Sequence, residues 1–187
     1  MNQIRGNDIS MIFQDPMSYL NPIVTIEKQM TEGIRFHTKC SKKEAVQRAI
    51  ELMKMVGIPA PESRLKQYPF EFSGGMRQRI IIAIALACNP KLIVADEPTT
   101  ALDVTIQTQI MDLMRQMNKK TNTAILLISH DLGVVSRLCS RVYIMYAGRI
   151  VESGPVDEIL TNPLHPYTKG LVEAIPDITK RGKPLKA

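Results

Sequence analysis

A short apolar segment that ends in two adjacent acids constrains this chain more than any other feature. Residues 92–95 are apolar, and Asp96 and Glu97 follow at once. A continuous apolar run of this length predicts a strand buried in a parallel sheet. The carboxyl end of such a strand is the edge at which open α/β sheets bind ligands. Carboxylates at this edge indicate a cation or a proton-transfer site, and a loop that merely begins with two acids is the alternative.

Size and composition favour a soluble domain that binds an anionic ligand. The chain has 187 residues, 24 basic and 18 acidic, with a net charge of +6. This mild excess suits a nucleotide or an anionic membrane surface and is too dispersed to indicate nucleic acid. The longest apolar run, residues 80–88, is shorter than the roughly 18 residues of a membrane span. We therefore expect any membrane contact to go through a partner. Three scattered cysteines predict reduced thiols in a cytosolic chain.

Strand and helix patterns alternate, which predicts an α/β fold with a mainly parallel sheet. Strands are expected at 9–13, 92–96, 124–128 and 142–146, with a hairpin to 149–152. Helices are expected at 25–37 (capped by Thr25), 42–56 (behind a Ser41–Glu44 capping box), 77–87, 104–120 and 132–138. The predicted organisation is a sheet segment at 1–24, a helical subdomain at 25–68, the rest of the sheet domain at 69–154 and a proline-rich tail at 155–187.

Three further features carry candidate functional residues. Ser73, Gly74 and Gly75 stand before a helix, where a capping serine and two glycines let backbone N–H groups approach an anion. Gln14 ends a predicted strand and could orient a water or touch a bound cation, and His130 follows a predicted strand, at the expected edge of Asp96 and Glu97. Each feature taken alone also has an ordinary structural interpretation: a capped helix, a surface glutamine and a structural histidine.

The order of these features, completed by residues 101–103 (Ala-Leu-Asp), resembles the ATP-binding subunit of ABC transporters. The resemblance covers almost the whole chain and implies a P-loop NTPase-like ABC ATPase domain with an inserted helical subdomain. Segments 13–17, 75–79, 99–105 and 162–168 resemble the di-/oligopeptide and nickel importer branch, and the last segment is the most branch-specific.

The resemblance implies ATP and Mg²⁺ as cofactors and a role for each acid. Asp96 would hold Mg²⁺ through water, and Glu97 would be the general base that polarises the attacking water. His130 would contact the γ-phosphate. Gln14 would contact the cation and pass the change to a transmembrane partner.

The resemblance also implies a head-to-tail dimer that closes on two ATP molecules and reopens on hydrolysis. Ser73, Gly74 and Gly75 would contact the ATP of the partner, and Asp103 would link the two sites. Phe72 and Met76 replace the commoner leucine and glutamine of the signature motif, a mild departure because Ser73 and the glycine backbone make the phosphate contacts.

The phosphate-binding motif G-x-x-x-x-G-K-[ST] is absent from this sequence. The only Gly-Lys pair is at 182–183, and Asp177 stands where the earlier glycine would be. We therefore expect the N-terminal part of the family domain to be incomplete. We also expect apolar surface to be exposed on the strands at 92 and 125, with a tendency to aggregate, and no ATP hydrolysis by the chain alone.

The expected partners are a second ATP-binding subunit, integral-membrane permease subunits and, indirectly, an extracytoplasmic solute-binding protein, with no nucleic acid. The expected location is peripheral, on the cytoplasmic face of the membrane. One alternative is a truncated, non-hydrolysing fragment that only lends its signature motif to a complete partner. Another is a soluble ABC ATPase of DNA repair or translation, which the lack of a long coiled coil disfavours. The cargo stays open between dipeptide, oligopeptide and nickel.

Overall fold

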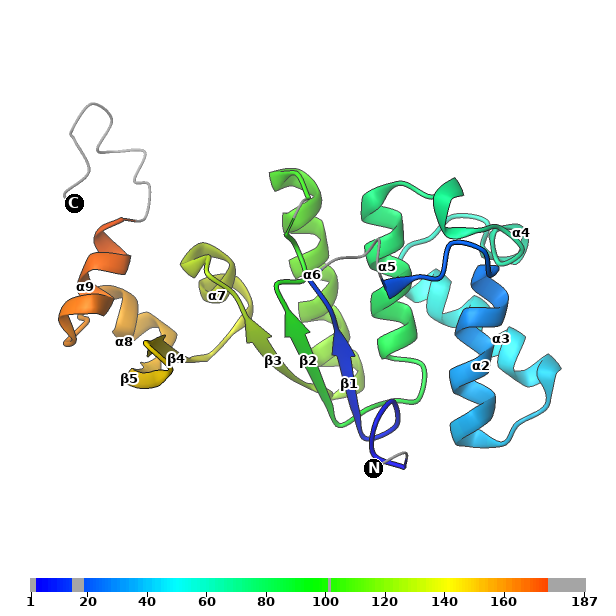
Figure 1. Ribbon diagram of the computed structural model, residues 1–187, viewed down its shortest axis with the longest axis horizontal. Coiled ribbons are helices and arrows are strands. Elements are labelled where there is room, and N and C mark those ends of the chain that lie inside the picture. The colour runs from blue at the N-terminus through cyan, green and yellow to red at the C-terminus, as the bar shows by residue number, and fades with distance from the viewer. Residues whose placement is uncertain (1–2, 15–18, 101, 175–187) are drawn as a thin grey trace. The chain divides into compact units, whose positions relative to one another are not determined.

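The computed structural model describes residues 3–14, 19–100 and 102–174, and the chain divides into two compact units (Figure 1). The first unit ends at Ile128 and the second begins at Ser129. The boundaries expected at residues 24, 68 and 154 stay predictions. None of the helices in the described ranges is long and apolar enough to cross a membrane.

The first unit contains a parallel sheet of three strands, as predicted. The strands are β1 (Ile9–Ile12), β2 (Leu92–Asp96) and β3 (Ala124–Ile128), in the order β1-β2-β3. In register, Ile9 lies opposite Leu92, and Leu92 lies opposite Ala124. The carboxyl ends of all three strands therefore lie at one edge of the sheet, which is where Gln14 and Glu97 follow β1 and β2.

Two helices cover one face of this sheet, namely α5 (Gly74–Ala85) and α6 (Val104–Thr121) (Figure 1). Side chains from both helices and all three strands line a small apolar cavity beneath them; they include Ile12, Ile82, Leu86, Ile93, Met114, Met117 and Ile125. The helix predicted from residue 77 begins instead at Gly74, because the Ser73 cap starts the first turn at the glycines.

The opposite face of the sheet is apolar and uncovered in the described residues. Ile9 and Met11 of β1 are 41% and 37% exposed, and Leu126 and Ile128 of β3 are 50% and 46% exposed. The predicted exposure of apolar surface is confirmed for β3. In β2, which was predicted to be a buried strand, buried and half-buried residues alternate, because alternate residues of a strand point to opposite faces and only one face of this sheet is covered.

The helices after β1 form a small helical region, as predicted. They are α2 (Ile26–Thr38), α3 (Lys42–Met55), the short α4 (Pro61–Arg64) and the 3-10 turn η1 (Pro69–Glu71). The predicted face of α3 is buried; its members are Ala45, Ala49, Leu52, Met53 and Val56. The capping box of Ser41 and Glu44 is confirmed, whereas Thr25 occupies the N-cap of α2 without a side-chain hydrogen bond.

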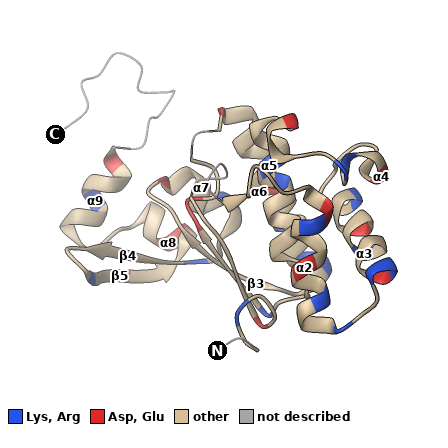
Figure 2. Cartoon of the chain, turned by 45° about the vertical axis from the view of Figure 1, so that its right-hand side comes forward, with Lys and Arg blue, Asp and Glu red and all other residues tan. Residues whose placement is uncertain are grey.

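Charged residues of both signs occur on α2 and α3 (Figure 2). Lys42 of α3 pairs with Glu27 of α2 at 3.5 Å, and Lys54 of α3 pairs with Glu62 of α4 at 2.6 Å. The Lys54 partner lowers the pKa of Glu62. These exposed pairs add little stability individually, so the buried face of α3 accounts for most of the packing here.

The second unit is built on an antiparallel hairpin, as predicted. Its strands β4 (Arg141–Tyr146) and β5 (Arg149–Pro155) join through Ala147 and Gly148, which have φ of 47° and 76°. The helices of this unit are α7 (Leu132–Leu138), α8 (Val156–Thr161) and α9 (Pro166–Glu173). Predicted features at residues 1–2, 15–18, 101 and 175–187 lie outside the described residues.

The segment that resembles the importer branch is anchored to the hairpin by one carboxylate. Glu152 of β5 accepts the backbone N–H groups of Leu164 and His165 at 2.8 and 3.0 Å. The nearby buried hydroxyl of Thr168 and these N–H groups lower the pKa of Glu152 from its ordinary 4.5. The hydrogen bonds of ordinary length and angle come from the N–H groups and not from Thr168. His165 also caps α9 by accepting the N–H of Tyr167 at 3.1 Å.

The lowered pKa gives this anchor a defined pH dependence. Because the folded carboxyl has the lower pKa, Glu152 contributes stability above its unfolded pKa and loses it as the pH falls through the folded value. We expect Glu152→Gln to lower the Tm at neutral pH and the difference from the wild type to vanish at strongly acidic pH. Glu173→Gln, which removes a carboxylate of α9 itself, is the control. Equal Tm values for Glu152→Gln and the wild type at neutral pH would contradict this role.

Candidate active site

Glu97 is held in a left-handed conformation directly after β2. Its φ is 44°, a region that costs a residue other than glycine roughly 1–2 kcal/mol. Its backbone N–H donates to the carbonyl oxygen of Ile128 at 3.0 Å, and its own carbonyl accepts the N–H of Thr100 at 3.1 Å. The surrounding backbone thus imposes the strained conformation, a feature that is concentrated at functional sites.

The side chain of Glu97 is oriented by two donors. Gln14 Nε2 donates to Oε2 at 2.7 Å, and Thr100 Oγ1 donates to the same oxygen at 2.9 Å. Gln14 follows β1 and Glu97 follows β2, and this contact between residues 83 positions apart joins the ends of the two strands at one edge of the sheet. Both hydrogen bonds end on Oε2 and so orient the carboxylate at the end of β2.

Asp96 completes the pair of acids at the end of β2. It is half-buried and lies in register with Ile128, on the sheet face opposite to Ile93 and Ala95. Carboxylate and amide oxygens are the ligands that Mg²⁺ prefers, and this cation usually keeps several waters. The carboxylate of Asp96 and the amide oxygen of Gln14 fit that preference. In the described ranges no three acids, histidines or cysteines converge to hold a metal ion, so water and phosphate oxygens would supply the remaining ligands.

The predicted signature residues form the exposed start of α5. Ser73 is the N-cap and accepts the N–H of Met76 at 3.4 Å, and Gly74 follows as the first helical residue. The N-terminus of a helix favours an anion through its free N–H groups and its dipole. Gly75 has a second role that the sequence did not suggest. A Cβ at this position would lie 2.8 Å from Cγ2 of Ile106 in α6, so only glycine allows the two helices to approach this closely.

Asp103 and His130 occupy different structural settings. Asp103 is exposed and caps α6, accepting the N–H of Ile106 at 2.9 Å. Its link to a second site stays a prediction. His130 is exposed and belongs to the second unit, so its placement beside Asp96 and Glu97 stays a prediction as well.

Two residues of this region were not predicted from the sequence. Thr100 bonds Glu97, and its only signal is a hydroxyl three residues beyond an acid, the spacing of a local turn. Gln78 of α5 is fully buried, and neither polar atom of its amide has a hydrogen-bond partner among the described residues. An orphaned buried amide is costly, and no sequence signal distinguishes Gln78 from a surface glutamine.

The fold and site define an ATP-binding cassette, and the family comparison agrees. A family model described as "ABC transporter" matches residues 1–100, more than half of the chain. A second model, "Oligopeptide/dipeptide transporter, C-terminal region", matches residues 151–187. The chain therefore belongs to the ABC transporter family.

The relatives that the chain resembles include transport ATP-binding proteins of Bacillus subtilis. The chain is 57% identical over 183 residues to the oligopeptide transport ATP-binding protein OppD of Bacillus subtilis (strain 168), covering 98% of this chain and 51% of the relative. It is 53% identical over 185 residues to the dipeptide transport ATP-binding protein DppD of the same organism, covering 99% and 55%. The chain thus spans about half the length of these relatives.

Solved structures of cassettes share the fold. One is a dimeric post-hydrolysis state of the ATP-binding cassette MJ0796 bound to ADP and Pi, with 31% identity, a TM-score of 0.70 and coverage of 82% of this chain and 65% of that chain. Another is cbiO1 from Clostridium perfringens, part of the ABC transporter complex cbiONQ, with 28% identity, a TM-score of 0.73 and coverage of 83% and 60%. These likenesses confirm the predicted α/β cassette fold.

Proposed function

We propose that this chain acts in the ATP-binding subunit of an ABC importer for peptides, in which ATP hydrolysis is coupled to transport. The observation that carries the proposal is the hydrogen bond from Gln14 to Glu97 at the carboxyl edge of β1 and β2. This hydrogen bond supports the proposal because it orients a carboxylate at the sheet edge where the resemblance described above implies the hydrolytic site. The peptide assignment is supported by the match at residues 151–187 and by the names of the relatives.

The mechanism assigns a task to each residue of the site. Glu97 accepts a proton from the attacking water as general base, and Gln14 and Thr100 fix its orientation. Asp96 would hold Mg²⁺ through water, and when bound this ion neutralises charge on the phosphate oxygens. Because Gln14 contacts Glu97 and begins the segment that leads to α2, it can relay the state of the site to a membrane partner. His130 would orient the attacking water.

A second candidate function is suggested by the 187-residue sequence, which contains no G-x-x-x-x-G-K-[ST]. The exposed start of α5 is intact, with Ser73 as its cap and Gly74 in its first turn. We infer that this chain lends Ser73, Gly74 and Gly75 to the ATP of a complete partner and does not hydrolyse ATP at its own acids.

The proposed assembly contains a second ATP-binding subunit, permease subunits in the membrane and, indirectly, an extracytoplasmic solute-binding protein. The chain would lie peripherally on the cytoplasmic face. Dipeptides and oligopeptides are the proposed cargo, and nickel is the alternative that a transport assay separates from them.

Reconstituted transport tests the proposal. The assay uses a hybrid in which a family member's segment carrying G-x-x-x-x-G-K-[ST] precedes residue 3, assembled with peptide permease subunits in vesicles. We expect ATP-dependent uptake of a labelled peptide and none of nickel, because the match at residues 151–187 is to peptide transporters. Vesicles without the hybrid are the control. Nickel uptake without peptide uptake would overturn the cargo, and ATP hydrolysis that is unaffected by the permease would overturn the importer role.

A further inference from the structure

Arg79 joins three elements of the first unit through one side chain. From the second turn of α5, its Nη1 donates to the carbonyl oxygen of Val56 at 2.7 Å, and its Nη2 donates to Oε1 of Gln109 at 3.1 Å. Val56 is the C-cap of α3, and Gln109 lies in α6. A guanidinium presents several N–H donors in a fixed plane, so it can hold two acceptors in this geometry, whereas a lysine ammonium is a single point of charge.

The backbone beside Val56 is built to admit this guanidinium. Gly57 has a φ of 76°, and a Cβ added to it would lie 3.2 Å from Nη1 of Arg79. Glycine is therefore favoured both by the backbone conformation and by the approach of Arg79. The positive charge also lies at the C-terminus of α3, where the helix dipole favours a cation.

A second tie lies one turn earlier on α5, at the signature residue Gly75. Gly75 precedes Arg79 by four positions on α5 and packs against Ile106, which precedes Gln109 by three positions on α6. Residues at these spacings share one face of a helix. The close approach at Gly75 and the hydrogen bond of Arg79 therefore form two successive contacts between the same faces of α5 and α6.

We propose that Arg79 is a positioning residue that fixes the signature residues Ser73–Gly75 relative to Asp103 at the start of α6 and to the end of α3. The functional part of this inference rests on the proposed signature-lending role. With Arg79 in place, the start of α5, the start of α6 and the end of α3 move as one body. The signature and Asp103 then reach a partner subunit in a fixed mutual geometry.

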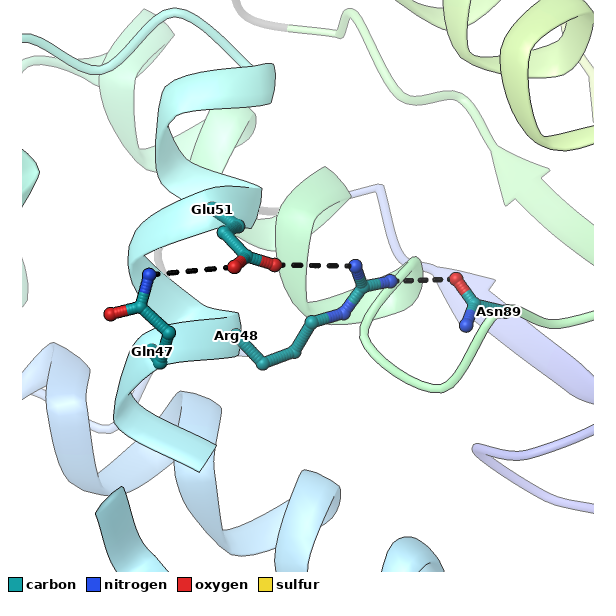
Figure 3. Close-up of polar contacts among 4 residues, drawn as sticks. All are labelled: Gln47, Arg48, Glu51 and Asn89. Carbon is teal, nitrogen blue, oxygen red and sulfur yellow. Dashed lines mark hydrogen bonds and ion pairs between the residues drawn. The ribbon is translucent and has the colours of Figure 1, made fainter. Parts of the chain in front are cut away.

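A matched control is available in Arg48, which ties α3 to the loop between α5 and β2 (Figure 3). Its Nη2 donates to Oδ1 of Asn89 at 2.6 Å, and its Nη1 pairs with Glu51 at 3.9 Å. Gln47 donates to the same carboxylate at 3.4 Å. Arg48 thus reaches the loop between α5 and β2, whereas Arg79 reaches α6.

Hydrogen exchange on the full chain tests the structural part without nucleotide. The reporters are the N–H groups of Ile106 and Gln107, which bond Asp103, and that of Gly57, which bonds Lys54. We expect Arg79→Gln to speed exchange at all three roughly 10-fold. Gln109→Leu should speed it at Ile106 and Gln107 only, and Arg48→Gln at none of them. Unchanged exchange at Ile106 and Gln107 in both Arg79→Gln and Gln109→Leu would overturn the inference. If Arg79→Gln does not fold, Gln109→Leu and Arg79→Lys replace it, because each alters the contact between Arg79 and Gln109.

ATP hydrolysis tests the functional part of the inference, namely that Arg79 positions the signature residues for a partner subunit. The chain is mixed with a full-length relative whose own signature serine is replaced by arginine, so that hydrolysis depends on the signature supplied by this chain. We expect Arg79→Lys to lower kcat about 10-fold with little change in the KM for ATP, and Arg48→Lys to leave both unchanged. Equal effects of the two lysine variants would indicate a merely structural role and overturn the assignment. If the wild-type chain supports no hydrolysis at all, the signature-lending proposal fails, and the exchange data still decide whether Arg79 couples the helices.

Discussion

Glu97→Gln should reduce ATP hydrolysis at least about 100-fold in a hybrid that carries a family member's phosphate-binding segment before residue 3. Glutamine keeps the size of the side chain and can still accept the hydrogen bonds of Gln14 and Thr100. It cannot accept a proton from water, so the chemical step is lost while the geometry is kept. ATP should therefore stay bound, and phosphate release together with retention of labelled ATP measures both effects.

A matched control separates the carboxylate from its support. Thr100→Val removes one donor to Oε2 and leaves the carboxylate and Gln14 in place. We expect a loss of about 10-fold, in keeping with one charge-assisted hydrogen bond. Hydrolysis that is unchanged in Glu97→Gln would sink the assignment of Glu97 as general base. A larger loss in Thr100→Val than in Glu97→Gln would indicate that orientation and not proton transfer dominates.

The second large effect concerns Ser73. The chain by itself should release no phosphate, because its sequence contains no G-x-x-x-x-G-K-[ST]. Added to a full-length relative with an arginine in place of its own signature serine, it should restore hydrolysis. Ser73→Arg in this chain should abolish that restoration, because a long cation would fill the exposed start of α5 and remove its cap. Phosphate release by the mixed subunits measures the effect.

The control for Ser73 is another serine of the first unit. Ser63 lies in the short helix α4, and its hydroxyl donates to the carbonyl oxygen of Ala60. Ser63→Arg introduces the same side chain away from α5 and should leave the restored hydrolysis intact. Two results would contradict the proposal: restoration that survives Ser73→Arg, or steady phosphate release by the chain alone that Glu97→Gln eliminates.

Much of the fold followed from local patterns. The alternation of apolar runs and capped helices predicted the parallel sheet, and the capping box at Ser41 predicted the start of α3 within one residue. The end of each strand was also predicted to carry polar residues, and the structure brings two of them, Gln14 and Glu97, into contact because parallel strands end on the same side. These features depend on residues close in sequence or on the general geometry of sheets.

Other features depend on packing between distant segments and were not accessible in this way. The left-handed φ of Glu97 arises from its bond to Ile128, and the need for glycine at position 75 arises from Ile106. The two donors of Arg79 meet acceptors 23 and 30 residues away. A continuous apolar run also does not show whether one face or both faces of a strand are covered. Leu126 of β3 belongs to such a run and is 50% exposed.

The uncovered face of the sheet connects exposed apolar surface to the backbone of the two acids. Ile128 contributes to that face, lies in register with Asp96 and accepts the backbone N–H of Glu97. Exposed apolar surface of this kind favours association with other apolar surface. Any contact that covers Ile128 therefore bears directly on the end of the strand to which Glu97 is bonded.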